Sequence, residues 1–395
     1  MRVTARLLIV LVIAASLISF AKSNYCLQTD WQTPGQYVHA CYSDIPALYG
    51  ERGLDKGLWP YSSADKSVEY PVLQGVVMWV MAQLLPAGIT SYFIGNTLFL
   101  VALFIGVALL VYKIRPEFAY LLPLAPAFVA SLFINWDLWA IATMLLAIYW
   151  FDRKADLASA IALGISISTK FLPIFLLIPI ALIFFRRQQL GKFFKYSAIS
   201  AVTFLAVNLP VALTTPEGWW RFYSLNLERG SDWGSLWYSL SNLGLDLEHQ
   251  NYLSLLLLLI AVTVFAIYFL QSAEILKLAH LALFIMVAVM AVSKVYSPQY
   301  VLWLTPLAII ALIDKRDLAF FWIWQGAELA YHLAIWQHLA TVTGAKFGLP
   351  VLAYSIISLF RIAASIALVL RLASRHRKSG VFPSEFLLST GESYP

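Results

Sequence analysis

One acid, Asp44, lies in the short polar segment Tyr42-Ser-Asp-Ile45, in the loop that follows the first apolar run of the chain. A carboxylate there could act as a general base that takes a proton from an attacking hydroxyl group. A solvated loop acid or a helix cap is the alternative interpretation of the same residue. No Cys/His cluster with metal-ligand spacing occurs in the sequence, so we expect chemistry without a metal.

Two lysines at predicted membrane boundaries are each followed by a proline, as Lys170-Phe-Leu-Pro173 and Lys294-Val-Tyr-Ser-Pro298. Lysines near helix ends commonly snorkel towards the interface. Two such ammonium groups at one face could instead hold a lipid-linked phosphate and stabilise its charge as it leaves. Arg229 is a third candidate, because a guanidinium can bind phosphate through two parallel hydrogen bonds. Its alternative is an ordinary loop arginine.

Several ionisable residues fall in or beside apolar runs. Asp137 begins one run, where it could cap a helix or contact a substrate. Glu328 and His332 are spaced i and i+4, which places them on one helix face. Ionisable groups within a span are costly and are often functional. This pair could relay a proton or form a polar contact between helices, with Arg361 as a possible charge partner.

Familiar cofactor and nucleotide motifs are missing from the sequence. It has no Gly-rich phosphate loop, no HExxH zinc motif and no GxSxG nucleophile motif. Nothing in it is typical of a nucleotide-sugar site, so a sugar donor would have to arrive through the membrane. We therefore expect no cofactor.

The composition is that of a polytopic membrane protein. Of the 395 residues, 61% are hydrophobic and 12% are charged, and the mean hydropathy is +0.76. Soluble domains carry about 25% charged residues. The net charge of +6 is explained by Lys and Arg in the predicted cytoplasmic loops, so we expect no nucleic-acid partner.

The apolar runs predict an all-α bundle of about twelve transmembrane helices. The predicted spans are 5–21, 90–112, 118–134, 136–152, 156–169, 171–185, 196–213, 251–270, 278–293, 299–313, 317–337 and 349–371. The segments 156–169 and 171–185 are short and could equally form one broken helix. Segment 71–87 has proline at both flanks and the length of an interfacial helix, so we expect a juxtamembrane helix there.

The distribution of Lys and Arg predicts both termini in the cytoplasm. A transmembrane domain over 1–373 would then carry two large extracytoplasmic loops, at 22–88 and 214–250. The segment 374–395 is predicted to be a disordered cytoplasmic tail. Cys26 and Cys41 both fall in the first loop, where an oxidising compartment would permit a disulfide, although two free cysteines are also compatible with the sequence.

The chain resembles glycosyltransferase family 87, of the GT-C superfamily, over roughly residues 40–305. The motifs that carry the resemblance are Tyr42-Ser-Asp-Ile45, Glu69-Tyr-Pro71, Asn135-Trp-Asp-Leu138, Gly164 with Lys170 and Pro173, and Lys294 with Ser297-Pro-Gln-Tyr300. That family includes polyprenyl-phosphate-mannose-dependent mannosyltransferases. It often has Pro-Pro after the tyrosine of the second motif, where this chain has Pro71-Val72.

The resemblance implies a metal-independent, inverting transferase in the cell membrane. It would move a sugar, expected to be mannose, from a polyprenyl-phosphate donor to a lipid or glycan acceptor outside the cytoplasm. Asp44 matches the position of the base, and Lys170, Lys294 or Arg229 would hold the phosphate. The further residues expected at the substrates are Tyr42, Glu69, Tyr70, Asp137 and Gln299, with Trp59, Tyr61 and Trp233 stacking on sugar rings.

Two other functions are compatible with the sequence. A transporter or flippase of lipid-linked sugars would use ionisable residues within the spans, and Glu328, His332 and Arg361 are such residues. A non-catalytic partner of another membrane enzyme is the third possibility. A transporter does not account for the acids and aromatic residues that gather in the two predicted outer loops.

Overall fold

The computed structural model describes residues 4–245, 247–272 and 275–379, with side chains up to residue 375, and this part of the chain contains helices and no strand. The first half comprises α1 (Ala5–Ala21), α2 (Asn24–Thr29), α3 (Gly35–Val38), α4 (Asp44–Glu51), η1 (Leu54–Lys56), α5 (Val72–Leu84), α6 (Ile89–Ile114), α7 (Leu121–Leu124), α8 (Pro126–Ser131), α9 (Asp137–Phe151), α10 (Asp156–Thr169), η2 (Leu172–Leu176) and α11 (Leu177–Arg186). The second half comprises α12 (Leu190–Thr214), α13 (Pro216–Glu228), α14 (Leu236–Asn242), α15 (Gln250–Gln271), α16 (Leu278–Val292), η3 (Pro298–Tyr300), α17 (Val301–Ala311), η4 (Lys315–Asp317), α18 (Leu318–Val342) and α19 (Val351–Ser379).

Within the described residues, four helices are long and apolar enough to cross a membrane: α6, α12, α15 and α19. Shorter apolar helices accompany them, among them α1, α9, α10 and α16, and most residues of α9 and α16 are buried. The chain is therefore an all-helical, multi-pass membrane protein. The expected count of about twelve spans stays a prediction.

The predicted span 118–134 is not one continuous helix. It forms the short helices α7 and α8, and Ala125 between them is extended, with φ −71° and ψ 108°. Pro126 explains the break, because the residue before a proline is driven out of helical geometry and proline itself has no amide hydrogen to donate. The prediction of a single span was wrong here.

The predicted segments 156–169 and 171–185 form separate elements. α10 ends at Thr169, and Lys170 is extended, with φ −146° and ψ 133°. The chain then enters the short η2 turn, which contains Pro173, and continues as α11. Lys170 is thus carried by an irregular stretch between two helices, which lets its side chain turn into the bundle.

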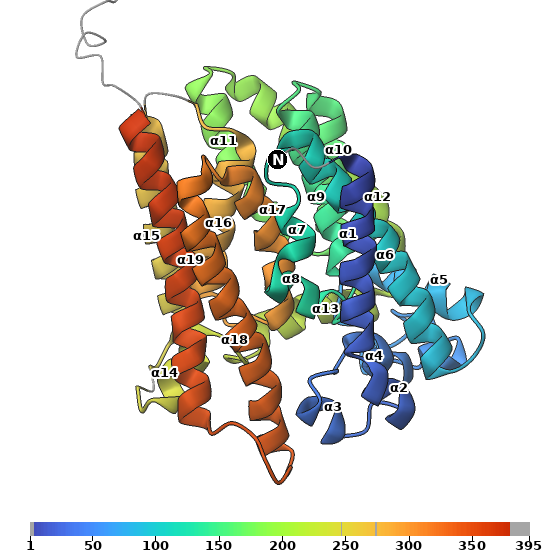
Figure 1. Cartoon of the computed structure of the whole chain (residues 1–395). Coiled ribbons are helices and arrows are strands. Elements are labelled where there is room, and N and C mark those ends of the chain that lie inside the picture. The colour runs from blue at the N-terminus through green and yellow to red at the C-terminus, as the bar shows by residue number, and fades with distance from the viewer. Residues whose placement is uncertain (1–3, 246, 273–274, 380–395) are drawn as a thin grey trace, which may run out of the picture.

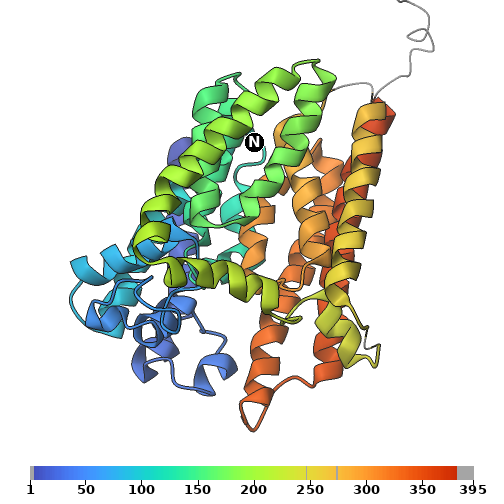
Figure 2. The ribbon, with the colours of Figure 1, turned by 180° about the vertical axis from the view of Figure 1, so that it is seen from behind.

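The two ends of the helix bundle differ in character. α1 begins and α19 ends at the upper end in Figure 1, whereas α2–α5 gather at the lower part of the molecule. Figure 2 shows α13 crossing the bundle near the same lower region. The 71–87 segment forms α5, and its juxtamembrane position stays a prediction, as does the cytoplasmic location of both termini.

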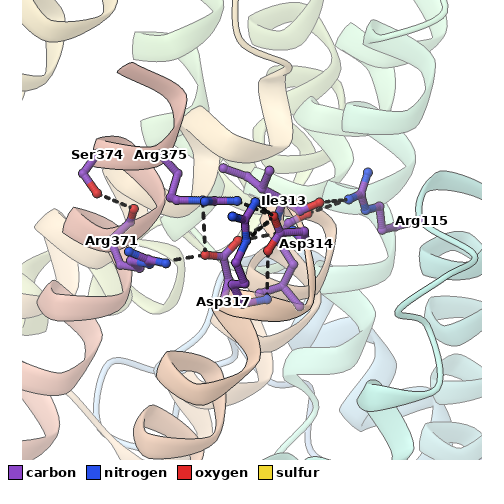
Figure 3. Close-up of polar contacts among 9 residues, drawn as sticks. Arg115, Ile313, Asp314, Asp317, Arg371, Ser374 and Arg375 are labelled. Atoms are coloured by element: carbon purple, nitrogen blue, oxygen red, sulfur yellow. Dashed lines mark hydrogen bonds and ion pairs between the residues drawn. The ribbon is translucent and has the colours of Figure 1, made fainter. Parts of the chain in front are cut away.

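A network of ion pairs fixes the end of α19 against the turn between α17 and α18 (Figure 3). Arg375 pairs with Asp314, and Nε of Arg371 lies 3.4 Å from Oδ1 of the fully buried Asp317. Arg115, which follows α6, donates to two backbone carbonyls at the end of α17. α19 continues to Ser379, past the predicted start of the tail at residue 374, and the rest of that tail, 380–395, lies outside the described residues.

Candidate functional site

Asp44 is the first residue of α4 and is held there by its backbone. Ser43 caps the helix, and its Oγ accepts from the amide of Ile45. The same hydroxyl donates to the carbonyl of Phe133 at 2.7 Å, and the Asp44 amide donates to the carbonyl of Ile134 at 2.7 Å. The turn between α8 and α9 therefore fixes the start of α4, so that the Asp44 side chain is free for other contacts.

The Asp44 carboxylate lies among two phenols and one cation. Tyr70 donates its hydroxyl to Oδ2 at 3.1 Å. Burial raises the pKa of Asp44 to about 6, against the opposing effect of hydrogen bonds from Tyr42 and Tyr70 and of the Lys170 charge. The pKa values of both phenols are raised well above 10, Tyr42 chiefly by the Asp44 charge and Tyr70 chiefly by burial. They remain protonated donors, and a carboxylate with a pKa near 6 suits general base catalysis near neutral pH.

Asp137 is the buried counter-ion of Lys170. Its Oδ1 lies 2.7 Å from the Lys170 ammonium, and its Oδ2 accepts from the Trp303 indole at 2.8 Å. Asp137 is 3% exposed and makes no side-chain cap of α9, so the predicted capping role does not hold. Burial would lower the pKa of Lys170, but the Asp137 and Asp44 carboxylates raise it, so the ammonium stays charged.

Tyr70 stands between the acid and the cation. Its hydroxyl contacts Asp44, while the Lys170 ammonium lies 4.9 Å from the centre of its ring. A cation over an aromatic face is stabilised by the ring quadrupole. One tyrosine thus connects the candidate base to the candidate phosphate-binding group.

Lys170 lines a cavity of about 490 Å³ whose other walls are almost entirely apolar. The walls come from η2, α13, α15 and α16, and the other polar groups belong to Tyr223, Asn226, Ser254, Ser293 and Tyr300. Residues that line it include Phe171, Phe175, Trp220, Phe222, Leu255, Leu258 and Met290. A site with an ammonium group and long apolar walls suits a molecule with an anionic head and a hydrocarbon chain.

Arg229 belongs to the second loop, and Lys294, which follows α16, is engaged with it. Arg229 forms an ion pair with Asp232, and the Lys294 ammonium donates to the Arg229 carbonyl at 2.6 Å. Lys294 and Arg229 line a different cavity, of about 350 Å³. Lys170 and Tyr300 line the first cavity, whereas Arg229 and Lys294 line this second one.

Glu69 connects the two large loops. Its Oε1 lies 2.7 Å from Arg52 in the first loop and 3.2 Å from Arg221 in α13. Neither arginine was among the predicted site residues. The sequence signals beside them are an acid directly before Arg52 and two tryptophans before Arg221. Glu69 therefore acts here as an anchor that fixes the neighbouring Tyr70.

The aromatic residues expected to stack on sugars occupy different environments. Tyr61 is 1% exposed, and its hydroxyl donates to the carbonyls of Tyr70 and Pro71, so it supports the Tyr70 segment and has no open ring face. Trp59 is half-buried and packs edge-on against Tyr61 and Trp79. Trp233, in the second loop, contacts the rings of Tyr238 and His338. Gln299 in η3 is 8% exposed.

Glu328 and His332 have separate partners in the described part of the chain. Glu328 accepts from Tyr296 and Trp324 and faces the Arg361 guanidinium at 3.8 Å. Arg361 itself is fully buried between the rings of Tyr296 and Tyr331. These contacts form a buried polar centre between α18 and α19.

His332 contacts Ser131 at 3.1 Å through Nδ1 and Lys22 at 3.3 Å through Nε2. It therefore contacts the ends of α1 and α8, whereas Glu328, one turn earlier on the same face of α18, faces Arg361. Cys26 and Cys41 form a disulfide, which cross-links the first loop just before Asp44. No group of three or more His, Cys, Asp and Glu residues suited to a metal ion occurs among the residues that the structure describes.

Comparison with known proteins shows a weak structural likeness. No family model matches the chain, and no curated protein matches it. Among solved structures, ArnT from Cupriavidus metallidurans bound to undecaprenyl phosphate is similar, with a TM-score of 0.48 and 13% identity over 93% of this chain and 77% of that chain. A likeness of this size establishes neither a shared fold nor a shared activity.

Proposed function

We propose that the chain is a membrane glycosyltransferase of the GT-C type, which moves a sugar from a polyprenyl-phosphate donor to a lipid or glycan acceptor. The observation that carries the proposal is the row Asp44–Tyr70–Lys170, whose lysine lines the apolar cavity. It combines a carboxylate with a pKa of about 6 and a charged ammonium, joined by one phenol. We expect the sugar to be mannose.

The reaction needs one base and one cationic group. Asp44 takes the proton of the acceptor hydroxyl as its oxygen attacks the anomeric carbon. The bond between that carbon and the phosphate oxygen breaks, and its electron pair leaves with the phosphate. Attack from the face opposite the phosphate inverts the anomeric centre. Because phosphate is a good leaving group, the second carboxylic acid typical of glycoside hydrolysis is unnecessary.

Lys170 is the group best suited to the leaving phosphate. An ammonium has three donor hydrogens, and Asp137 occupies one of them, so two remain for phosphate oxygens. Preorganised charge of this kind stabilises the developing anion without further rearrangement. Arg229 would assist from the second loop after exchanging its present partner, Asp232.

The proposal is tested by transfer from labelled polyprenyl-phosphate-mannose, with native lipid extract supplying the acceptor. Membranes would contain wild type, Asp44→Asn or the control Asp65→Asn, an exposed acid in the same loop. We expect transfer by wild type and the control, and a loss of about 10²- to 10⁴-fold in Asp44→Asn. Equal transfer by all three would remove Asp44 as base, and no transfer from this donor by wild type would reject the donor.

A transporter is the alternative, and it would rest on the buried Glu328 and Arg361. Their contacts to Tyr296, Trp324 and Tyr331 account for both residues as a structural centre. Lipid-linked sugar crossing a vesicle membrane without bond cleavage would favour transport instead.

A further inference from the structure

A second groove lies between α1 and the α7–α8 segment, which are adjacent in Figure 1. Its volume is about 480 Å³, and its walls are mostly apolar, with Ile18, Pro126 and Val129 among them. Ile18 is 68% exposed, and the preceding Leu17 is 64% exposed, so this side of α1 is open to the surroundings of the bundle. Nothing in the proposed transfer reaction uses this groove.

Two polar groups lie in this apolar groove. The Lys22 ammonium donates to the Ala130 carbonyl at 2.6 Å and lies 3.3 Å from Nε2 of His332. Within the described residues, Lys22 forms no ion pair with a carboxylate, in contrast to Lys170 with its counter-ion Asp137. Burial lowers the pKa of Lys22 to about 7, because no negative charge of the protein compensates.

Ser19, one turn before Lys22 on α1, is the second polar group. It is 2% exposed, and its hydroxyl has no hydrogen-bond partner in the described part of the chain. Ser16 on the same helix donates to the carbonyl of Val12, which is the usual arrangement for a helical serine. An unpaired buried hydroxyl costs free energy unless a ligand oxygen accepts from it.

We propose that this groove binds an anionic phospholipid, with its phosphate at Lys22, its ester or phosphate oxygen at Ser19 and an acyl chain along the apolar wall. The negatively charged phosphate complements the Lys22 ammonium, which has no counter-ion. The apolar wall favours a lipid, because a hydrated free anion would not gain from contact with it. The site is independent of the proposed transferase reaction, since neither Asp44 nor Lys170 contributes to it.

The groove adjoins the segment that holds Asp44. His332, the neighbour of Lys22, contacts Ser131 at the end of α8, and the next turn supplies the carbonyls that fix Ser43 and Asp44. A lipid in the groove would therefore lie against the same short segment that positions the candidate base.

Native mass spectrometry of the purified full chain tests the proposal. The protein would be released from detergent with equal amounts of phosphatidylglycerol and zwitterionic phosphatidylcholine. We expect wild type to retain phosphatidylglycerol preferentially. Lys22→Gln should reduce that preference about 5-fold, as expected for one lost lysine–lipid contact. Lys22→Arg should keep it, and Lys56→Gln, an exposed lysine in the first loop, is the matched control.

Ser19→Leu provides a second route, because it removes the hydroxyl and fills the groove while leaving Lys22 in place. It should also reduce retention of phosphatidylglycerol, and it decides the question if Lys22→Gln fails to fold. Equal retention of phosphatidylglycerol by wild type, Lys22→Gln and Ser19→Leu would overturn the proposal. Displacement of the lipid by excess inorganic phosphate would overturn the choice of a lipid and identify a free-anion site.

Discussion

Lys170 and Asp137 form an ion pair at 2.7 Å, although 33 residues separate them in the chain. They meet because α9 and α10, of 15 and 14 residues, pack against each other as a helical hairpin, so that the start of one lies beside the end of the other. Asp137 is 3% exposed, and a carboxylate so deeply buried requires a positive partner. The pair therefore holds the ammonium at the end of the apolar cavity.

Removal of Lys170 should affect stability and activity in separable ways. Lys170→Gln leaves Asp137 buried without its counter-ion, and we expect a loss of about 3–5 kcal/mol in the free energy of unfolding. The double variant Lys170→Gln/Asp137→Asn removes both charges and should recover most of that stability, measured by thermal unfolding in detergent.

If Lys170 binds the phosphate, the double variant should remain inactive despite its recovered stability. Recovery of transfer together with stability would show that the pair serves only the fold. Lys56→Gln, which alters an exposed lysine of the first loop, should leave both properties unchanged.

The transfer rate should fall at acid pH because Asp44 acts in its ionised form. Burial raises its pKa to about 6, so the carboxylate is ionised above that pH and becomes protonated below it. We expect kcat/KM to decrease about tenfold per pH unit below 6. A rate that stays flat between pH 5 and about 7.5 would contradict the assignment of Asp44 as base.

Tyr70→Phe should move the decrease of kcat/KM at acid pH towards higher pH. The phenol donates to the Asp44 carboxylate and so favours its ionised form, and its loss raises the pKa of Asp44 further. At pH 6 we expect transfer about 3- to 10-fold slower than in wild type, with a smaller difference at pH 8. An equal decrease at both values would mean that Tyr70 acts on the substrate and not on Asp44.

Arg361 should be essential for stability rather than for transfer. Arg361→Met leaves Glu328 buried without a positive charge, and we expect a loss of about 3–5 kcal/mol. Arg361→Met/Glu328→Gln should lose less, and the folded fraction should retain transfer. Thermal unfolding and transfer per folded molecule decide between this role and a moving charge in a transporter.

The apolar runs predicted most of the helices because length and hydropathy are local properties. The expected segments 5–21 and 156–169 coincide with α1 and α10, and 90–112 differs from α6 by one or two residues at each end. The hydropathy of 118–134 predicts one helix, but the segment contains Pro123 and Pro126 and forms two short helices. The restriction that Pro126 places on the backbone of Ala125, and not the hydropathy, decides the structure at that point.

The partners within the site were much harder to predict. Lys170 and Lys294 have similar sequence surroundings, which predict a shared role. In the folded chain, however, Lys170 forms an ion pair with Asp137, whereas Lys294 donates a hydrogen bond to the Arg229 carbonyl. The sequence does not mark Lys22 as a site residue, because a lysine after an apolar helix is common at a membrane boundary. Pairing of this kind depends on tertiary contacts, which local sequence patterns do not encode.

The ion pair between Arg221 and Glu69 connects one wall of the apolar cavity to the segment that carries Tyr70. Arg221 lies in α13 between Trp220 and Phe222, which line that cavity, and Glu69 precedes Tyr70 in the chain. An occupant that displaces α13 must either break the Arg221–Glu69 contact or pull on the backbone that carries the Tyr70 hydroxyl. In the proposed reaction, occupancy of the cavity would therefore bear on the hydrogen bond that Tyr70 donates to Asp44.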